Sequence, residues 1–122
     1  MYQAKSLVKK IAAKLDFHKG EDIVIYDVSE KTPLARYYLV AGASNARKVH
    51  GLASEAEEIL DKSQASILHI EGKSPECVWT LIDAHDIVIS IMTLDERNRL
   101  QFDSIYQGCP KVDFTYDPNK IA

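Results

Sequence analysis

Apolar residues recur every three or four positions in two segments of the chain, residues 3–17 and 46–62. This spacing places apolar side chains on one face of a helix, so both segments are predicted to be amphipathic helices. The second has the more regular stripe, made of Val49, Leu52, Ala53, Ala56, Ile59 and Leu60. Ser44 or Asn45 precedes this stripe, and both residue types cap helix N-termini.

Short runs rich in β-branched and aromatic residues fill much of the remaining chain, and each run predicts a strand. Two of them lie between the helices, at 22–28 and 35–41. Three more follow the second helix, at 66–70, 79–83 and 87–92.

After the last strand, residues 94–102 predict a short helix, and the periodic pattern then ends. Two prolines and a polar mixture predict a loosely attached, irregular tail over 108–122, which leaves 1–107 as one domain. The crossover through the long helix predicts that the second and third strands run parallel. The last two strands are expected to form an antiparallel hairpin. The expected fold is therefore α/β (α+β-like), with a mixed five-stranded sheet.

The last strand has two faces that are both largely apolar. Alternation places Ile87, Ile89 and Ile91 on one face, and Val88, Ser90 and Met92 on the other. The two long helices are expected to cover one face only. An exposed apolar sheet face indicates an interaction site, and a partner protein is one candidate to bury it.

Composition narrows the class of protein. The chain has 122 residues, of which 46% are hydrophobic and 27% charged, as is usual for one globular domain. Its net charge of −3 gives no overall electrostatic case for nucleic-acid binding. Cys77 and Cys109 lie far apart and suggest neither a disulfide framework nor a zinc site. No apolar run resembles a signal peptide or membrane span, so a cytoplasmic location is expected.

Two carboxylates and an imidazole lie between the last two strands, at Asp83, His85 and Asp86. An Asp–His pair can orient a general base, and two carboxylates can hold a metal ion. Aspartate is also favoured in tight turns, because its side chain accepts hydrogen bonds from nearby backbone N–H groups. No nucleophile or third ligand stands at a diagnostic spacing, so the turn interpretation is favoured over catalysis.

The segment GASN, residues 42–45, resembles a phosphate-binding loop because a glycine and a serine precede a helix. It lacks the further glycines and lysine of the known phosphate-loop motifs. The acids that follow, Glu55, Glu57 and Glu58, lie on the predicted helix and cannot assemble a metal site. A helix cap is therefore favoured, and no catalytic set is identified.

An ordered set of short motifs resembles the ribosomal silencing factor (Iojap) family over roughly residues 5–106. The set comprises Asp27-Val28, the YYLVA strand, Arg47-x-Val49, Glu71-Gly72, Trp79, Asp83, Asp86 and an acid–acid–x–Arg helix start. The chain departs from the family pattern at Arg36, at the GASN junction, at His85 where glycine is usual, at Ser90 where histidine is usual, and at Leu100 and Tyr106.

The resemblance implies a fold similar to the nucleotidyltransferases but without their catalytic acids. It also implies a function without bond chemistry, cofactor or metal. The family binds the fourteenth protein of the large ribosomal subunit, blocks joining of the small subunit and so represses translation. Its members are often homodimers when free. No membrane or sequence-specific nucleic acid is implied as a partner.

The resemblance also implies partner-binding roles for residues around the last hairpin. Trp79 is expected as an aromatic anchor, although a lone tryptophan is equally often core packing. The other expected contacts are Asp83, His85 and Asp86 at the edge of the surface, Ser90 and Met92 on the last strand, and Glu71 and Arg97 at the rim. Two alternatives stay open: a nucleotide-using enzyme with magnesium on Asp83 or Asp86, and a dimeric adaptor whose open face binds a second copy.

Overall fold

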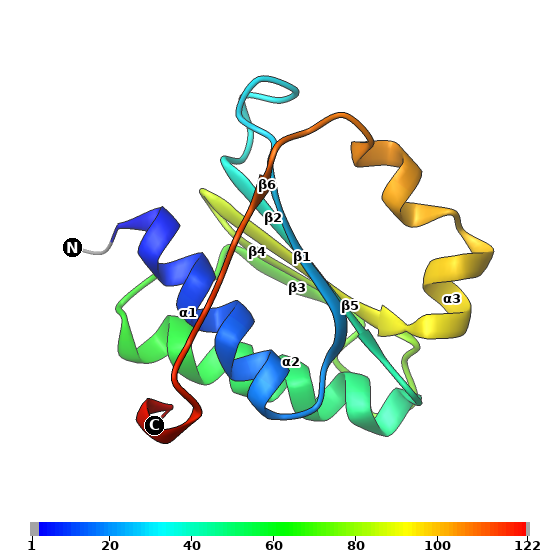
Figure 1. Cartoon of the computed structure of the whole chain (residues 1–122). Coiled ribbons are helices and arrows are strands. Elements are labelled where there is room, and N and C mark those ends of the chain that lie inside the picture. The colour runs from blue at the N-terminus through cyan, green and yellow to red at the C-terminus, as the bar shows by residue number, and fades with distance from the viewer. Residues whose placement is uncertain (1–2, 122) are drawn as a thin grey trace.

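A computed structural model describes residues 3–121 (Figure 1). Two long helices form one layer and a β-sheet forms the next. The helices are α1 (Ala4–Phe17), α2 (Ala46–Lys62) and the short α3 (Leu94–Arg99), with 3₁₀ turns η1 (Phe102–Tyr106) and η2 (Pro118–Lys120). The strands are β1 (Glu21–Asp27), β2 (Tyr37–Ala43), β3 (His69–Glu71), β4 (Trp79–Ala84), β5 (Ile87–Thr93) and β6 (Lys111–Val112).

The sheet is mixed, with the strand order β3-β4-β5-β2-β1-β6. β2 and β5 pair in parallel at its centre, and every other neighbouring pair is antiparallel. β3 therefore runs in the same direction as β2, as the helical crossover predicts, with β4 and β5 between them. The predicted α/β class and the β4–β5 hairpin are confirmed.

The sheet has six strands rather than the expected five. The extra strand, β6, pairs with the outer edge of β1, where Val112 lies opposite Ile25. The Asp27 amide also donates to the Pro110 carbonyl at 2.8 Å. Further along this segment Phe114 packs against the core, and the Tyr116 hydroxyl donates to Asp16 Oδ2 at 2.5 Å. The segment expected as a loose tail thus covers one edge of the sheet.

Two predicted element boundaries are corrected. The strand expected over 66–70 is shorter and later, at His69–Glu71. The helix expected over 94–102 stops at Arg99, because Gln101 takes a left-handed conformation with φ of 51° and the chain continues as η1. The left-handed residue reverses the chain, which brings η1 back onto the sheet.

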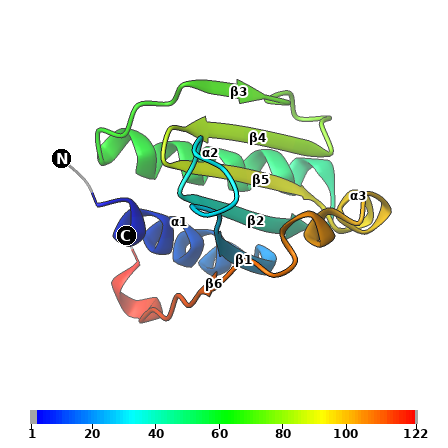
Figure 2. The same cartoon turned by 90° about the horizontal axis from the view of Figure 1, so that it is seen from above.

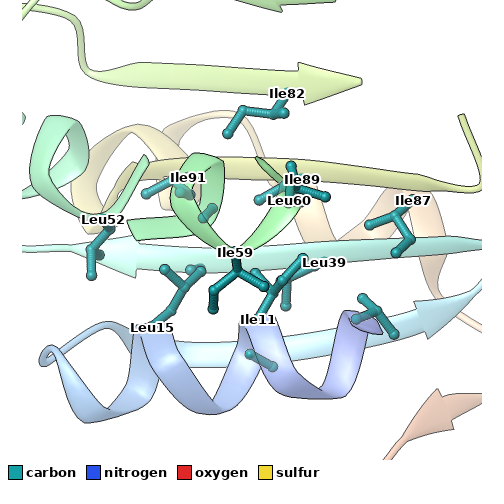
Figure 3. Close-up of a cluster of buried hydrophobic side chains, with 14 of the residues drawn as sticks. Ile11, Leu15, Leu39, Leu52, Ile59, Leu60, Ile82, Ile87, Ile89 and Ile91 are labelled. Carbon is teal, nitrogen blue, oxygen red and sulfur yellow. The ribbon is translucent and has the colours of Figure 1, made fainter. Parts of the chain in front are cut away.

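The main core lies between the two long helices and one face of the sheet. Figure 3 shows side chains of both helices, such as Leu15 and Leu60, meeting those of the central strands. Ile87, Ile89 and Ile91 all point into this core and are fully buried, as the predicted alternation requires. Burying each such side chain contributes about 1.5–3 kcal/mol before entropy is counted.

A second, smaller core lies on the opposite face of the sheet. Its buried members are Tyr26, Val28, Val40, Met92 and Phe102. α3 and η1 cover this core at one end of the sheet, while β3 and β4 have no helix over the same face (Figure 2). The expectation that both long helices pack on one side is therefore confirmed, and the other side is only partly covered.

Candidate docking surface

The uncovered part of the second sheet face is formed by alternate residues of β3, β4 and β5, and we call it the docking surface. Strand register places His69 opposite Asp83, Glu71 opposite Leu81, and Trp79 opposite Met92. It is made of His69, Glu71, Trp79, Leu81, Asp83 and Val88. These side chains are all at least partly exposed, and the surface combines three apolar side chains with the polar or charged side chains of His69, Glu71 and Asp83.

Trp79 lies on this surface with its indole braced from below. Its Nε1–H donates to Ser90 Oγ at 3.1 Å, and its ring meets Phe102 edge-on with centroids 5.7 Å apart. Trp79 is only partly buried, so one side of the ring supports the second core and the other meets solvent. The sequence left core packing and an exposed position equally open for Trp79, and the structure combines the two.

Ser90 is the centre of a small polar network beneath the surface. It is fully buried, and besides Trp79 it bonds the Tyr38 hydroxyl at 2.7 Å. Met92 is also fully buried. Ser90 and Met92 therefore support the surface rather than contact a partner directly.

The loop between β3 and β4 approaches Trp79 closely. Gly72 has φ of 73°, and a Cβ atom added there would lie 2.1 Å from the Trp79 carbonyl oxygen. The Thr80 hydroxyl donates to the Gly72 carbonyl at 2.6 Å and fixes this approach. Only glycine fits here, which gives a structural reason for the glycine of the Glu71-Gly72 motif.

The Asp83, His85 and Asp86 cluster has the contacts of a turn. Asp83 Oδ1 accepts from the His85 backbone N–H at 3.2 Å. The Asp86 carbonyl accepts from the backbone N–H groups of Arg36 and Tyr37, at 2.8 and 2.9 Å. Within residues 3–121, no group of three or more His, Cys, Asp or Glu side chains is placed to hold a metal ion. The geometry favours the turn interpretation.

His85 carries backbone strain in this turn, because its φ of 68° lies in the left-handed region. A side chain in that conformation costs about 1–2 kcal/mol, and glycine avoids the cost. We expect His85→Gly to raise the free energy of unfolding by about 1 kcal/mol. Urea unfolding followed by circular dichroism measures this change. Ala84→Gly, at the adjoining strand position, should instead destabilise, and stabilisation by both variants would contradict the strain argument.

The two residues expected at the rim lie in different environments. Glu71 is exposed, and its Oε1 is 3.0 Å from His69 Nε2. Arg97 is buried rather than at a rim, with 7% of its surface exposed. Its guanidinium donates to both carboxylate oxygens of Asp103 and, at 2.6 Å, to the Asp22 carbonyl. Arg97 therefore ties α3 to η1 and to β1.

Burial shifts one titration in the polar network strongly. It raises the pKa of Tyr38 from 10.0 to about 12, and the hydrogen bond to Ser90 opposes the rise only in part. The folded state therefore prefers the neutral phenol. Stability from this preference is complete below pH 10 and is lost as the pH rises through about 12.

We accordingly expect the free energy of unfolding to fall more steeply between pH 10 and 12 in the parent than in Tyr38→Phe. Phenylalanine keeps the ring but has no proton to release. Urea unfolding at several pH values in this range measures the difference. Parallel pH curves for the parent and Tyr38→Phe would contradict the prediction.

The GASN segment serves as a helix cap, as predicted. Asn45 Oδ1 accepts from the Lys48 backbone N–H at 2.8 Å. The glutamates that follow on α2 are spread among separate cations: Glu55 pairs with Lys14, Glu57 with Lys73 and Glu58 with Lys62. These contacts disperse the carboxylates that a metal-dependent enzyme would need to converge.

The sequence did not indicate the aromatic cluster behind the docking surface. Tyr38 and Tyr106 approach with centroids 4.9 Å apart, and Phe102 meets the Tyr38 ring at 5.8 Å. Tyr26 completes the group at 5.5 Å from Tyr106. The available signal was the aromatic character of Phe102 and Tyr106, which flank the end of the predicted helix.

Comparison with known proteins decides the family. The model of the family described as "Ribosomal silencing factor during starvation" matches residues 2–121. This chain belongs to the ribosomal silencing factor family. Among curated relatives, Ribosomal silencing factor RsfS of Bacillus subtilis (strain 168) is 27% identical over 116 residues, covering 95% of this chain and 98% of the relative. The protein of the same name from Chromobacterium violaceum is 31% identical over 103 residues, covering 83% of each chain.

Solved structures agree with the fold. A crystal structure of a protein from Chromobacterium violaceum superposes with a TM-score of 0.82 at 27% identity, covering 98% of both chains. A second, from Bacillus halodurans, gives a TM-score of 0.76 at 21% identity and supports the fold alone. The resemblance inferred from short motifs is confirmed.

Proposed function

We propose that this ribosomal silencing factor binds the large ribosomal subunit through its fourteenth protein and sterically blocks joining of the small subunit, repressing translation. The observation that carries the proposal is the uncovered face of β3, β4 and β5, with the half-exposed Trp79 held by Ser90 and Phe102 at the end of that face next to η1. A rigid aromatic side chain in an apolar patch is typical of binding hot spots.

Steric obstruction needs a surface and no reaction. A standard interface buries about 800 Å² on each partner, which suits a sheet face of this kind. The side chains that an enzyme would use are committed to the turn, the helix cap and surface ion pairs. We therefore propose a non-enzymatic role, carried out in the cytoplasm where ribosomes work. No helix within residues 3–121 is long and apolar enough to cross a membrane.

The proposed contacts fall into two groups. Trp79, Asp83, His85, Asp86 and Glu71 would meet the partner directly, since each is at least partly exposed. The buried residues would not touch the partner but would position the groups that do. Ser90 and Met92 would support the indole from beneath, and Arg97 would hold α3 in place.

A subunit-joining assay tests the proposal. Purified large subunits are incubated with the protein, small subunits are added, and joining is followed by light scattering and by sedimentation. We expect dose-dependent loss of joined ribosomes, with the protein sedimenting with the large subunit alone. Unchanged joining at saturating protein would overturn the proposal.

The free protein's molar mass, measured by light scattering, separates the dimeric-adaptor alternative. A stable dimer that does not bind large subunits would support that alternative, in which a second copy occupies the docking surface.

A further inference from the structure

Helix α1 concentrates positive charge in a chain that is negative overall. It carries four lysines and one aspartate, a net charge of +3, while the whole chain has a net charge of −3. Lys5 and Lys10 are exposed and Lys9 is partly exposed. Among the described residues these three lysines form no ion pair, whereas Lys62 on α2 and Arg99 on α3 each pair with a carboxylate.

This arrangement is electrostatically unfavourable for the isolated helix. Lys5 and Lys9 are four residues apart, as are Lys10 and Lys14, so each pair places like charges on neighbouring turns. Lys5 also lies in the first turn, where the helix dipole favours acidic residues, and that turn contains none. The helix therefore carries repulsion that an external anion would relieve.

The basic surface continues from α1 onto neighbouring segments. A hollow between α1, α2 and the C-terminal segment is lined by Lys10, Lys14, Lys62 and Lys120. Glu58 is the acid lining this hollow, and its carboxylate already accepts from Lys62 Nζ at 2.8 Å. Four lysines from three separate segments thus surround one neutralised carboxylate.

We propose that the α1 lysines, Lys5, Lys9 and Lys10, bind the phosphate backbone of ribosomal RNA beside the docking site. This inference rests on the proposed function, which places the protein on an RNA-rich particle. Lysine is a mobile point charge that suits phosphates without sequence preference. The apolar stripe of α1 is buried in the main core, so the helix has no apolar face to insert into a lipid surface.

The position of α1 suits a second contact. α1 lies beneath the β1 and β2 end of the sheet and away from β3, while the docking surface lies on the opposite face (Figures 1 and 2). A protein seated by its docking surface therefore presents α1 on its far side, where the lysines are open to phosphates. The lysines would add affinity and orientation, while the docking surface supplies specificity.

Neutralising variants test the inference. Lys5→Gln, Lys9→Gln and Lys10→Gln are combined in one protein, since glutamine keeps helix propensity. The control combines Lys48→Gln, Lys73→Gln and Lys111→Gln and has the same net charge. Binding to a fluorescent RNA hairpin is measured by anisotropy at several salt concentrations. We expect the α1 triple variant to bind at least ten-fold more weakly, with a slope of log affinity against log salt shallower by about 2–3. The control should resemble the parent.

Equal RNA binding by the two triple variants, or no RNA binding by the parent, would overturn the inference. Binding of the parent to phosphatidylglycerol vesicles without RNA binding would overturn it in favour of a lipid surface.

Titration with large subunits separates the two proposals. Trp79→Ala should weaken subunit binding at every salt concentration without changing the slope, whereas the α1 triple variant should change the slope. A parent that binds RNA but not subunits contradicts the proposed function alone. Subunit binding unaffected by the α1 substitutions contradicts this inference alone.

Discussion

Trp79→Ala should weaken binding to large ribosomal subunits by at least about 2 kcal/mol, or roughly thirty-fold. The indole is the largest side chain of the docking surface, and contacts with Ser90 and Phe102 hold its orientation. A preorganised aromatic ring loses little conformational entropy on binding, so its truncation removes area that nothing else supplies. Titration of labelled protein with subunits measures the loss.

The matched control for this variant is Phe17→Ala. Phe17 is 42% exposed, is also aromatic, and lies at the end of α1 away from the docking surface. It should leave subunit affinity within about two-fold of the parent, a difference under about 0.5 kcal/mol. Because Trp79 is the single tryptophan, the folding of its variant must be checked by circular dichroism rather than by fluorescence. A folded Trp79→Ala protein with parental affinity would remove the anchor role.

Arg97→Met should lower the free energy of unfolding by about 2–3 kcal/mol. Methionine replaces the aliphatic stem but leaves the Asp103 carboxylate without its partner and the Asp22 carbonyl without its donor. Breaking a fully buried pair costs about 3–5 kcal/mol. The expected loss is smaller here because the Asp103 side chain is 45% exposed and water can solvate it. Urea unfolding measures the effect.

Arg99→Met provides the comparison within the same helix. Arg99 pairs with Glu96 three residues earlier, its side chain is 67% exposed, and exposed pairs contribute about 0–1 kcal/mol. Its loss should therefore be small. Equal destabilisation by the two variants would show that the Arg97 contacts do not hold α3 and η1 to β1.

The sequence predicted those parts of the fold that periodicity determines. Both long helices begin and end within about two residues of the expected positions, because a stripe such as that of α2 tolerates only one face in the core. Ile87, Ile89 and Ile91 were assigned to the correct side of the sheet for the same reason. Asn45 was recognisable as a cap because its chemistry is local.

The features that the sequence missed depend on contacts between distant segments. β6 has two residues and no pattern of its own, and it becomes a strand because β1 offers an unpaired edge. Ser90 joins Tyr38, 52 residues away, to Trp79, 11 residues away, and no local signal marks it as a hub. Arg97 was expected at the rim of a surface, although tertiary hydrogen bonds draw its guanidinium inside.

The parallel pairing of β2 with β5 at the centre of the sheet has a consequence for the synthesis of this protein. Residues Tyr37–Ala43 pair early with β1, but their second partner is Ile87–Thr93. A nascent chain that has released α1, the β1–β2 hairpin and α2 therefore still lacks the strand that completes the core. Pairings between such distant segments form slowly, because a long loop must close before any contact repays its entropy. Until that late strand emerges, the growing polypeptide exposes apolar helix faces and an unpaired edge, the features that make a partial fold a substrate for chaperones.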